Sequence, residues 1–421
     1  MSDSADENPE IVVGPREQLF HLIAEASEIE HTLMCSYLYA AFSLKTGDDT
    51  GLSDAEAAAV ASWRESIMSV AIDEMVHLLL VSNLAVAVGA RPHFDRPNFP
   101  VESGYFPSGV VVKLTPFSLE TLDHFIFLER PQGYQLEDGE GFEPAREYER
   151  EQPYSGLMPS VQDYATVGRL YEALRVNLIA CSKRLGEQRL FANAVNAQID
   201  RDLVDLEGIA RVADLRTALA AIDVIVEQGE GSESDRDGSH YHRFSDIKAQ
   251  YAQLLEANPK FAPAWPAAEN PVMRRPPTPE GKVFIEHPTA ARFLDFANAI
   301  YGLLLRCLVQ VFECSLNERR REQTRFMNAA IQLMHLFASA SNALVRLPAT
   351  NDQSGVNAGV TFTMLRSVAP LLGGSVGERL VHERLGELKL AAKSLARTVP
   401  EFAALSDRLG QMQAEFSSRI E

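Results

Sequence analysis

The segment that decides the fold is Asp73-Glu-Met-Val-His77, which lies within a long helical pattern. Glu74 and His77 are spaced i, i+3, so on a helix their side chains leave the same face. Leu78 and Val81 continue that face with apolar side chains, which predicts that the face points into a core. A carboxylate and an imidazole are costly to bury alone, and a metal ion would supply the compensating charge. The alternative is a chance Glu-x-x-His on a surface helix with salt bridges.

The helix that carries this segment is one of four predicted in series. Ser53, followed three residues later by Glu56, resembles a capping box and predicts that the helix begins there and runs to Ala87. Apolar residues at spacings of three and four predict an earlier helix over about 15–44. Further helices are predicted over about 162–186 and 211–229, with shorter ones within 190–208 and up to 256.

Residues 91–161 form a long connection between the second and third helices. Prolines recur along it and break any long helix. The sequence predicts a short strand at 110–114, a short helix at 118–128 and an acidic surface loop at 137–151. Connections of this length are uncommon and often functional. One long crossover between helix pairs is a known way to build a four-helix bundle, and the crossover and the loop at 229–242 are expected to form a substrate entrance.

The first helix offers Glu30, which shares a stripe with Met34 and Tyr37 and therefore points toward the expected core. The alternative is a glutamate at the edge of the stripe that pairs with an arginine. Tyr37, further along the same stripe, could lie near a metal as a redox-active or hydrogen-bonding phenol, or could simply be a core tyrosine. Glu30 is thus a candidate metal ligand and Tyr37 a candidate catalytic residue.

The third and fourth helices offer further acidic residues. Glu172 lies beside an apolar stripe, and its alternative role is an ion pair with Arg169 or Arg175. Glu227 and Glu230 repeat the i, i+3 spacing near the end of the fourth helix. The loop after it could fold His240 or His242 back toward them, although an acidic helix end beside a solvent loop explains the same pattern.

Together these residues give the order Glu, Glu-x-x-His, Glu, Glu-x-x-Glu and then His along four helices. Di-iron carboxylate bundles use a Glu-x-x-His pair from each of two helices and one glutamate from each of the others. Carboxylates with one or two imidazoles suit iron or manganese, and zinc remains an alternative. The candidate metal ligands are Glu30, Glu74, His77, Glu172, Glu227, Glu230 and His240.

Composition bounds the function classes. The chain has 421 residues, 46% apolar and 23% charged, with a net charge of −19. The acidic balance argues against nucleic-acid binding and against docking on an anionic membrane. The longest apolar stretch, at about 300–312, is too short and too polar to span a bilayer. Four cysteines without a CxxC pair predict reduced thiols and a cytoplasmic protein.

The remaining segments are assigned by composition. Residues 1–13 are predicted to be a disordered tail before a bundle domain over 14–257. Residues 258–288 are rich in proline and predict an extended connector. Residues 289–421 predict an additional helical region, with helices at about 289–316, 319–346, 376–398 and 401–419. Motifs of nucleotide-binding folds and serine hydrolases do not occur in the sequence.

Several stretches resemble a known family. Residues 30–45, 72–78 and 89–100 resemble the bacterial ferritin-like family and, more narrowly, its iminophenyl-pyruvate dimer synthase-type domain. That domain is also found in large enzymes of the violacein and indolocarbazole pathways. Residues 125–131, 226–231 and 239–244 are similar too. The resemblance covers about residues 14–256 well and the C-terminal half loosely.

The resemblance implies a mainly α, ferritin-like four-helix bundle with a dinuclear metal site. Carried over by position, the ligands are Glu30, Glu74, His77, Glu172 and Glu227, with Glu230 and His240 as further candidates. Glu230 stands where the second Glu-x-x-His would have its histidine. This departure leaves the number and identity of the metal ions open.

The expected function is that of an O₂- or peroxide-dependent oxidase, oxygenase or oxidative coupling enzyme of secondary metabolism. Its substrate would be a small aromatic or amino-acid-derived metabolite, and its cofactor two iron ions. A homo-oligomer is compatible with the sequence. Two alternatives remain: an iron-handling protein without organic turnover, and a helical scaffold whose site has decayed.

Overall fold

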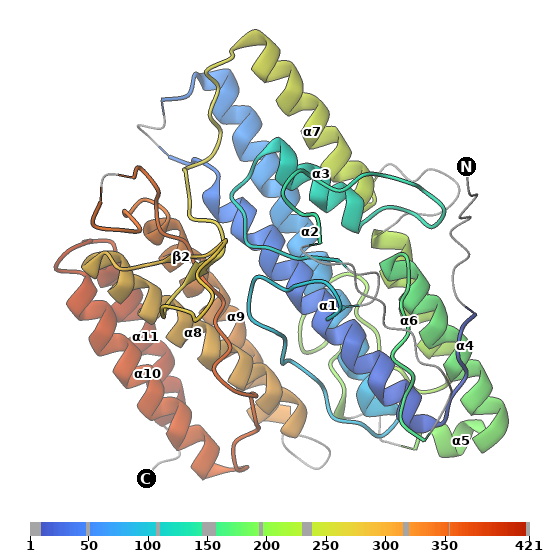
Figure 1. The fold of residues 1–421 in the computed structure, drawn as a ribbon. Helices are drawn as coiled ribbons and strands as arrows, with labels where there is room; N and C mark the ends of the chain where they lie inside the picture. The colour runs from blue at the N-terminus through green and yellow to red at the C-terminus, as the bar shows by residue number, and fades with distance from the viewer. Residues whose placement is uncertain are drawn as a thin grey trace, which may run out of the picture. The chain divides into compact units, whose positions relative to one another are not determined.

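The computed structural model describes residues 10–47, 51–106, 110–144, 157–192, 197–229, 238–314, 320–352 and 354–417. It is predominantly helical, as the sequence predicts (Figure 1). The chain divides into two compact units. The first contains most of the chain up to Pro263, and the second contains the chain from Ala264 onward together with two short segments, 114–116 and 202–204. The division falls inside the predicted connector.

The first unit is built on an α-hairpin of two long helices, α1 (Arg16–Ser43) and α2 (Asp54–Ala87). They lie side by side along much of their length (Figure 1). The capping box predicted for α2 is confirmed: the Glu56 backbone N–H donates to Ser53, and the Glu56 carboxylate accepts from the Ser53 N–H. Most of both helices is buried, because other elements cover the pair on several sides.

Four shorter helices complete the bundle as two broken rods. They are α3 (Leu119–Leu128), α4 (Val167–Leu185), α6 (Leu215–Gly229) and α7 (His240–Ala257). Helix α3 packs on α7, and α4 packs on α6 (Figure 1). We describe α3 with α4 as one broken rod and α6 with α7 as the other, because the members of each pair follow one another along α1 and α2 (Figure 1). Both rods are interrupted near the middle of the α1–α2 pair, where polar side chains gather.

Two predicted elements differ in the structure. The segment 110–114 forms one isolated bridge, between Val112 and Val101, rather than a strand. The stretch 190–208 holds the end of the short helix α5 (Glu187–Leu190) and, in its described part, turns. Asn83 explains the second difference: its side-chain amide donates to Ile199 O and accepts from Ile199 N, so a side chain satisfies backbone groups that a helix would use.

The described part of the predicted N-terminal tail is attached to the bundle. Gly14 N–H donates to the Asn177 side chain of α4, which in turn donates to Val12 O. Val12 N–H also donates to Gln162. Residues 1–9 lie outside the described part of the chain. Residues 10–14 therefore extend along α4 before α1 begins.

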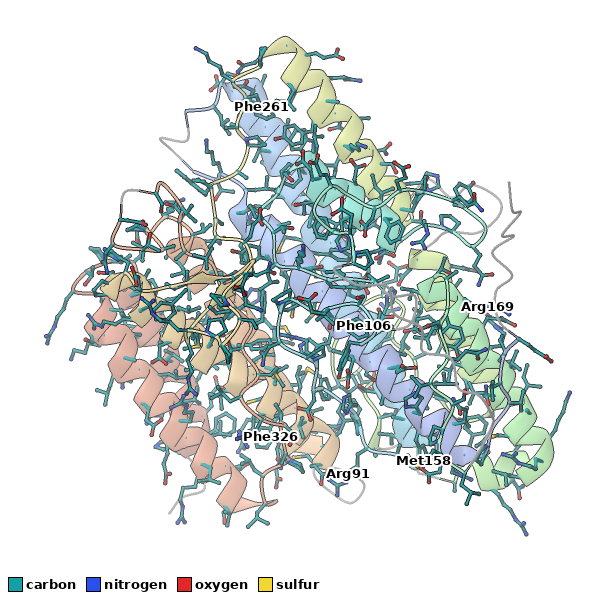
Figure 2. All side chains as sticks on the ribbon, viewed as in Figure 1. Arg91, Phe106, Met158, Arg169, Phe261 and Phe326 are labelled. Atoms are coloured by element: carbon teal, nitrogen blue, oxygen red, sulfur yellow. The ribbon has the colours of Figure 1, made fainter. Side chains whose placement is uncertain are left out.

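Aromatic side chains fill the far end of the first unit. Trp63 of α2 stacks on Phe117 with ring centroids 5.7 Å apart. Tyr251 of α7 and Phe261 close the cluster at centroid distances of 5.5 and 6.0 Å from Trp63 (Phe261 is labelled in Figure 2). The Trp63 indole N–H donates to Gln250 of α7 at 2.8 Å. The cluster ties α7 to α2 and thereby sets where the start of α7 lies.

In its described residues, the second unit contains four helices and a two-stranded sheet. The helices are α8 (Pro288–Glu313), α9 (Arg320–Leu344), α10 (Ser375–Leu395) and α11 (Phe402–Ser417), as predicted for this region to within a few residues. Strands β1 (Pro271–Val272) and β2 (Val283–Phe284) pair in parallel. Phe293 and Phe402 pack edge to face at 4.5 Å, and Phe326 of α9 (Figure 2) packs on Phe416 at 5.5 Å.

Helices α2 and α8 are long and apolar enough to cross a membrane by length and composition alone. However, 83% of the apolar window of α2 and 78% of that of α8 are buried inside the fold. Core helices of soluble proteins pass the same test, because a helix that is apolar on all sides is expected wherever protein surrounds it. Their hydropathy is therefore accounted for by packing.

Candidate metal centre

Five acidic and imidazole side chains converge where the two rods are interrupted. Glu30 comes from α1, Glu74 and His77 from α2, Glu129 from the residue after α3, and His240 from the first position of α7. All five are buried, with relative exposures of 6% or less. They form two groups of three that could each hold a metal ion, and the ligand atoms within each group lie within 4.8 Å of one another.

Glu30, Glu74 and His77 make the first group, here called the Glu30–His77 half. His77 Nδ1 lies 3.2 Å from Glu30 Oε2 and 3.1 Å from Glu74 Oε2. His77 Nε2 lies 2.8 Å from the Gln228 Oε1 of α6. Because Nε2 donates to the amide oxygen, Nδ1 is the ring nitrogen left to face the two carboxylates.

Glu74, Glu129 and His240 make the second group, here called the Glu129–His240 half. His240 Nδ1 lies 3.0 Å from Glu74 Oε1 and 3.6 Å from Glu129 Oε2. Glu74 belongs to both groups and turns one oxygen toward each histidine. A carboxylate in this position could bridge two ions.

Two buried tyrosines each hold one oxygen of a terminal carboxylate, meaning a carboxylate that belongs to only one of the two groups. Tyr171 of α4 donates to Glu30 Oε1, and Tyr37 of α1 donates to Glu129 Oε1. Each carboxylate therefore has one oxygen held by a phenol and one turned toward the cluster. Burial, followed by the adjacent carboxylates, raises the pKa of both phenols well above the usual value, so both remain hydroxyl donors at neutral pH.

The electrostatics of the cluster reflect its burial. Burial, then repulsion from Glu74, raises the pKa of Glu30 to about 8. Burial alone would lower the pKa of His77, but Glu74 and Glu30 raise it to about 10. Burial opposes ionisation of Glu74 too, yet His77 and His240 hold the pKa of Glu74 well below its usual range. Without a cation, protons would have to balance these carboxylates.

The residues present fit a pair of metal ions. Neither ring nitrogen of the buried His240 has a hydrogen-bond partner in suitable geometry, although carboxylate oxygens surround it. This orientation suits a lone pair directed at a cation. Gly229, the last residue of α6, leaves room for the Glu129 carboxylate, because a Cβ at this position would lie only 3.2 Å from Glu129 Oε2. Three carboxylates and two imidazoles are a donor set for iron or manganese.

A narrow cleft, partly open to solvent, leads to the cluster. Its outer walls come from the start of α4, with Val167 and Gly168, and from the end of α6, with residues 225, 226 and 229. Glu30, Glu74, His77, Glu129 and Tyr171 line its inner end. The interruption of both rods therefore does two things: it supplies ligands from helix ends, and it opens a passage to them.

Two of the predicted ligands, Glu172 and Glu227, lie away from the cluster. Glu172 is 40% exposed and pairs with Arg175 at 3.4 Å, the alternative that the sequence allowed. Glu227 is exposed on α6. In both cases the adjacent residue faces inward instead, Tyr171 and Gln228 respectively. Successive side chains on a helix point about 100° apart, so a shift of one position determines whether a side chain faces the cluster or the solvent.

The two histidines that follow α6 in the sequence lie in different places. His240 lies in the cluster, whereas His242 Nδ1 lies 2.9 Å from Ser239 Oγ, in the N-terminal cap of α7. Glu230 lies outside the described residues. The second imidazole of the cluster thus comes from the start of a new helix.

Sequence reasoning missed Glu129, Tyr171 and Gln228. Glu129 follows the short helix α3 inside the long connection, which the sequence predicts only as an entrance. Its one signal was the similarity of residues 125–131 to the family. Tyr171 and Gln228 carry no metal-ligand chemistry of their own, so no spacing rule would single them out.

Metal binding is expected to release protons at neutral pH. His77, with its pKa raised to about 10, is protonated at pH 7 in the metal-free protein, and Glu30, with its pKa raised to about 8, is largely protonated too. A ligand must lose its proton to bind, so affinity is expected to rise between pH 6 and 9. Calorimetric titration with Co²⁺ in buffers of different ionisation enthalpy measures the release, and a buffer-independent heat at pH 7 would contradict it.

The fold and the cluster define a class: a helical bundle that surrounds a carboxylate and imidazole centre suited to two metal ions. The family model described as "Ferritin-like" matches residues 23–249, more than half of the chain. The chain belongs to the ferritin-like family. A solved ferritin-like protein from Caulobacter vibrioides shares the fold, with a TM-score of 0.50 and 20% identity, over 82% of this chain and all of that one.

Two curated relatives are similar over most of this chain. Dichlorochromopyrrolate synthase of Lentzea aerocolonigenes is 27% identical over 91% of the chain. The 2-imino-3-(indol-3-yl)propanoate dimerase of Chromobacterium violaceum is 27% identical over 92% of it. The alignments cover 39% and 37% of those proteins, so the chain spans about two fifths of their length. Both relatives are named as enzymes that act on small molecules.

Proposed function

We propose that this protein is a dimetal oxidative enzyme that couples or oxidises a small aromatic, amino-acid-derived metabolite with O₂ or peroxide as oxidant. The observation that carries the proposal is the pair of ligand groups that share Glu74, each with a terminal carboxylate held by a buried tyrosine. A surface salt-bridge cluster would not have these five side chains at 6% exposure or less.

Iron is the proposed metal, with two ions for each chain. Glu30 and His77 would hold one ion, Glu129 and His240 the other, and Glu74 both. Hard carboxylate oxygens with few imidazoles favour iron or manganese over metals that prefer thiolates, and zinc would also fit the donor set. A bound iron pair supplies the capacity to pass electrons between an organic substrate and O₂ or peroxide.

The protein's own residues would position the ligands and exclude water. Gln228 fixes the ring of His77, and Tyr171 and Tyr37 fix the carboxylates of Glu30 and Glu129. Outer partners of this kind orient ligands and tune their basicity. We assign Tyr37 a positioning role through Glu129, and its buried phenol is also the group placed to give or take a proton there.

A small substrate is favoured by the narrow cleft that leads to the cluster and by the names of two relatives. The two relatives are named for dichlorochromopyrrolate and for 2-imino-3-(indol-3-yl)propanoate, and the indole of the second name favours an aromatic amino-acid derivative here. Joining two such molecules by a carbon–carbon bond removes two electrons and two protons, which O₂ would accept as hydrogen peroxide.

The acidic surface and the buried thiols support the cellular setting. All four cysteines are buried and free of disulfides, which favours a reducing, cytoplasmic compartment. The net charge of −19 disfavours nucleic acid and anionic membranes as partners. A homo-oligomer remains compatible with this proposal.

Oxygen uptake tests the proposal. Iron-loaded protein is supplied with 2-imino-3-(indol-3-yl)propanoate, generated from indole-3-pyruvate and ammonium, or with its phenyl counterpart. We expect O₂ uptake that depends on the metabolite, and a product with the mass of two substrate molecules less two hydrogens, beyond the protein-free background. Iron oxidation that is indifferent to metabolites would instead indicate iron handling, and absence of bound metal would indicate a scaffold.

A further inference from the structure

We infer that the two halves of the cluster differ in metal affinity and in access from the cleft. Asp73 and Gln228 are the positioning residues that set the difference in affinity. The Glu129–His240 half holds its ion tightly in an enclosed position. The Glu30–His77 half holds its ion more weakly and presents it to the cleft, where an exogenous ligand arrives. This inference rests on the proposed dimetal function.

The first observation is the group behind each histidine. His77 Nε2 faces the neutral amide of Gln228 at 2.8 Å. His240 Nε2 faces the Asp73 carboxylate at 3.4 Å, and Arg243 holds that carboxylate at 3.1 Å. Asp73 lies at ion-pair distance from His240 without a hydrogen bond in suitable geometry, and its negative charge makes the imidazole a more basic ligand than a neutral amide does. The His240 imidazole should therefore bind the more firmly held ion.

The second observation is access. The cleft is lined by Glu30, His77 and Tyr171, so the first half opens into it. In the Glu129–His240 half, Glu129 also lines the cleft. His240 and Tyr37 are fully buried and are not among the described residues that line it.

Aromatic rings that do not line the cleft pack beside the Glu129–His240 half. Tyr37, which holds Glu129, packs against Phe125 of α3 and Phe244 of α7 at centroid distances of 4.6 and 5.0 Å. Phe125 and Phe244 are themselves 5.1 Å apart. These rings leave the Glu30–His77 half as the side that a small molecule in the cleft meets first.

Stepwise metal titration tests the inequality. Metal-free protein is titrated with Co²⁺ by calorimetry and by visible absorption, and we expect one tight and one weaker step. Asp73→Asn should weaken the tight step about 10–100-fold and narrow the gap between the steps. Gln228→Leu should weaken the other step and widen the gap. Asp223→Asn, which removes a carboxylate from an exposed pair with Arg175, is the matched control.

The outcomes separate this inference from the proposed function. If the wild-type protein binds no metal, the proposed function fails. If two ions bind but Asp73→Asn and Gln228→Leu change the gap in the same direction, or not at all, the inference alone is overturned. Circular dichroism of each variant checks that the fold persists, so that loss of a metal-binding step is distinguished from unfolding.

Azide tests the access route, because it is a small anion whose binding to a loaded metal changes the visible spectrum. Val226→Phe, at the cleft wall, should retain both metal ions but bind azide at least 10-fold more weakly. Ala220→Phe, on the exposed surface of the same helix, should bind azide as the wild-type protein does. Equal azide binding by all three proteins would overturn the assignment of the cleft as the route.

Discussion

Glu74→Gln is expected to lose both metal ions. Glu74 is the one residue shared by the two ligand groups, and its two oxygens face different histidines. Glutamine keeps the shape but removes the negative charge and places an amide N–H₂ toward one of the two positions. Loss of an outer partner alone costs about 10–100-fold in metal affinity, so loss of this ligand should cost more than 100-fold at each position.

Elemental analysis after dialysis against trace metal measures this loss. The wild-type protein should retain about two ions per chain, and Glu74→Gln close to none. Its melting temperature should also no longer rise when metal is added, since ligand binding to the native state is what raises it. Glu172→Gln is the control, because that carboxylate lies in an exposed pair with Arg175. Full metal content in Glu74→Gln would refute the assigned centre.

His240→Gln is expected to lose one ion of the two and to destabilise the metal-free protein. Carboxylates at 3.0 and 3.6 Å from Nδ1 and at 3.4 Å from Nε2 surround this buried imidazole. Burial lowers the pKa of His240, but those carboxylates raise it well above the usual value, so it is a cation at pH 7. Removing one partner of a buried ion pair costs roughly 3–5 kcal/mol.

The stability contribution of His240 has a definite sign with pH. Because its folded-state pKa is raised, the contribution is fully present below the unfolded value of about 6.5 and declines as pH rises toward the raised value. The difference in unfolding free energy between wild type and His240→Gln, both metal-free, should therefore be larger at pH 6 than at pH 10. His242→Gln, whose side chain lies in the cap of α7 and outside both ligand groups, should keep two ions. An unchanged metal content in His240→Gln would exclude His240 as a ligand.

Local pattern predicted much of the fold. The apolar periodicity and the Ser53–Glu56 capping box located α1 and α2 to within a residue or two. The same periodicity located the four C-terminal helices. These features depend on residues within a few positions of each other, which is why sequence reveals them. The segment 190–208 shows the limit, since Asn83, more than a hundred residues away, decides its backbone pairing.

The sequence by itself determined that Glu74 and His77 share one face of a long helix and that Glu30 lies on the buried stripe of another, because the 3.6-residue repeat is a local property. Only the tertiary structure decided which groups meet them. Glu129 and His240 arrive from helix ends where two rods are interrupted, and Tyr171 and Gln228 face inward in place of their acidic neighbours. Which side chains face the cluster depends on where helices from distant parts of the chain end and how each is rotated when they pack. The spacing of residues along a single helix carries no information about this packing.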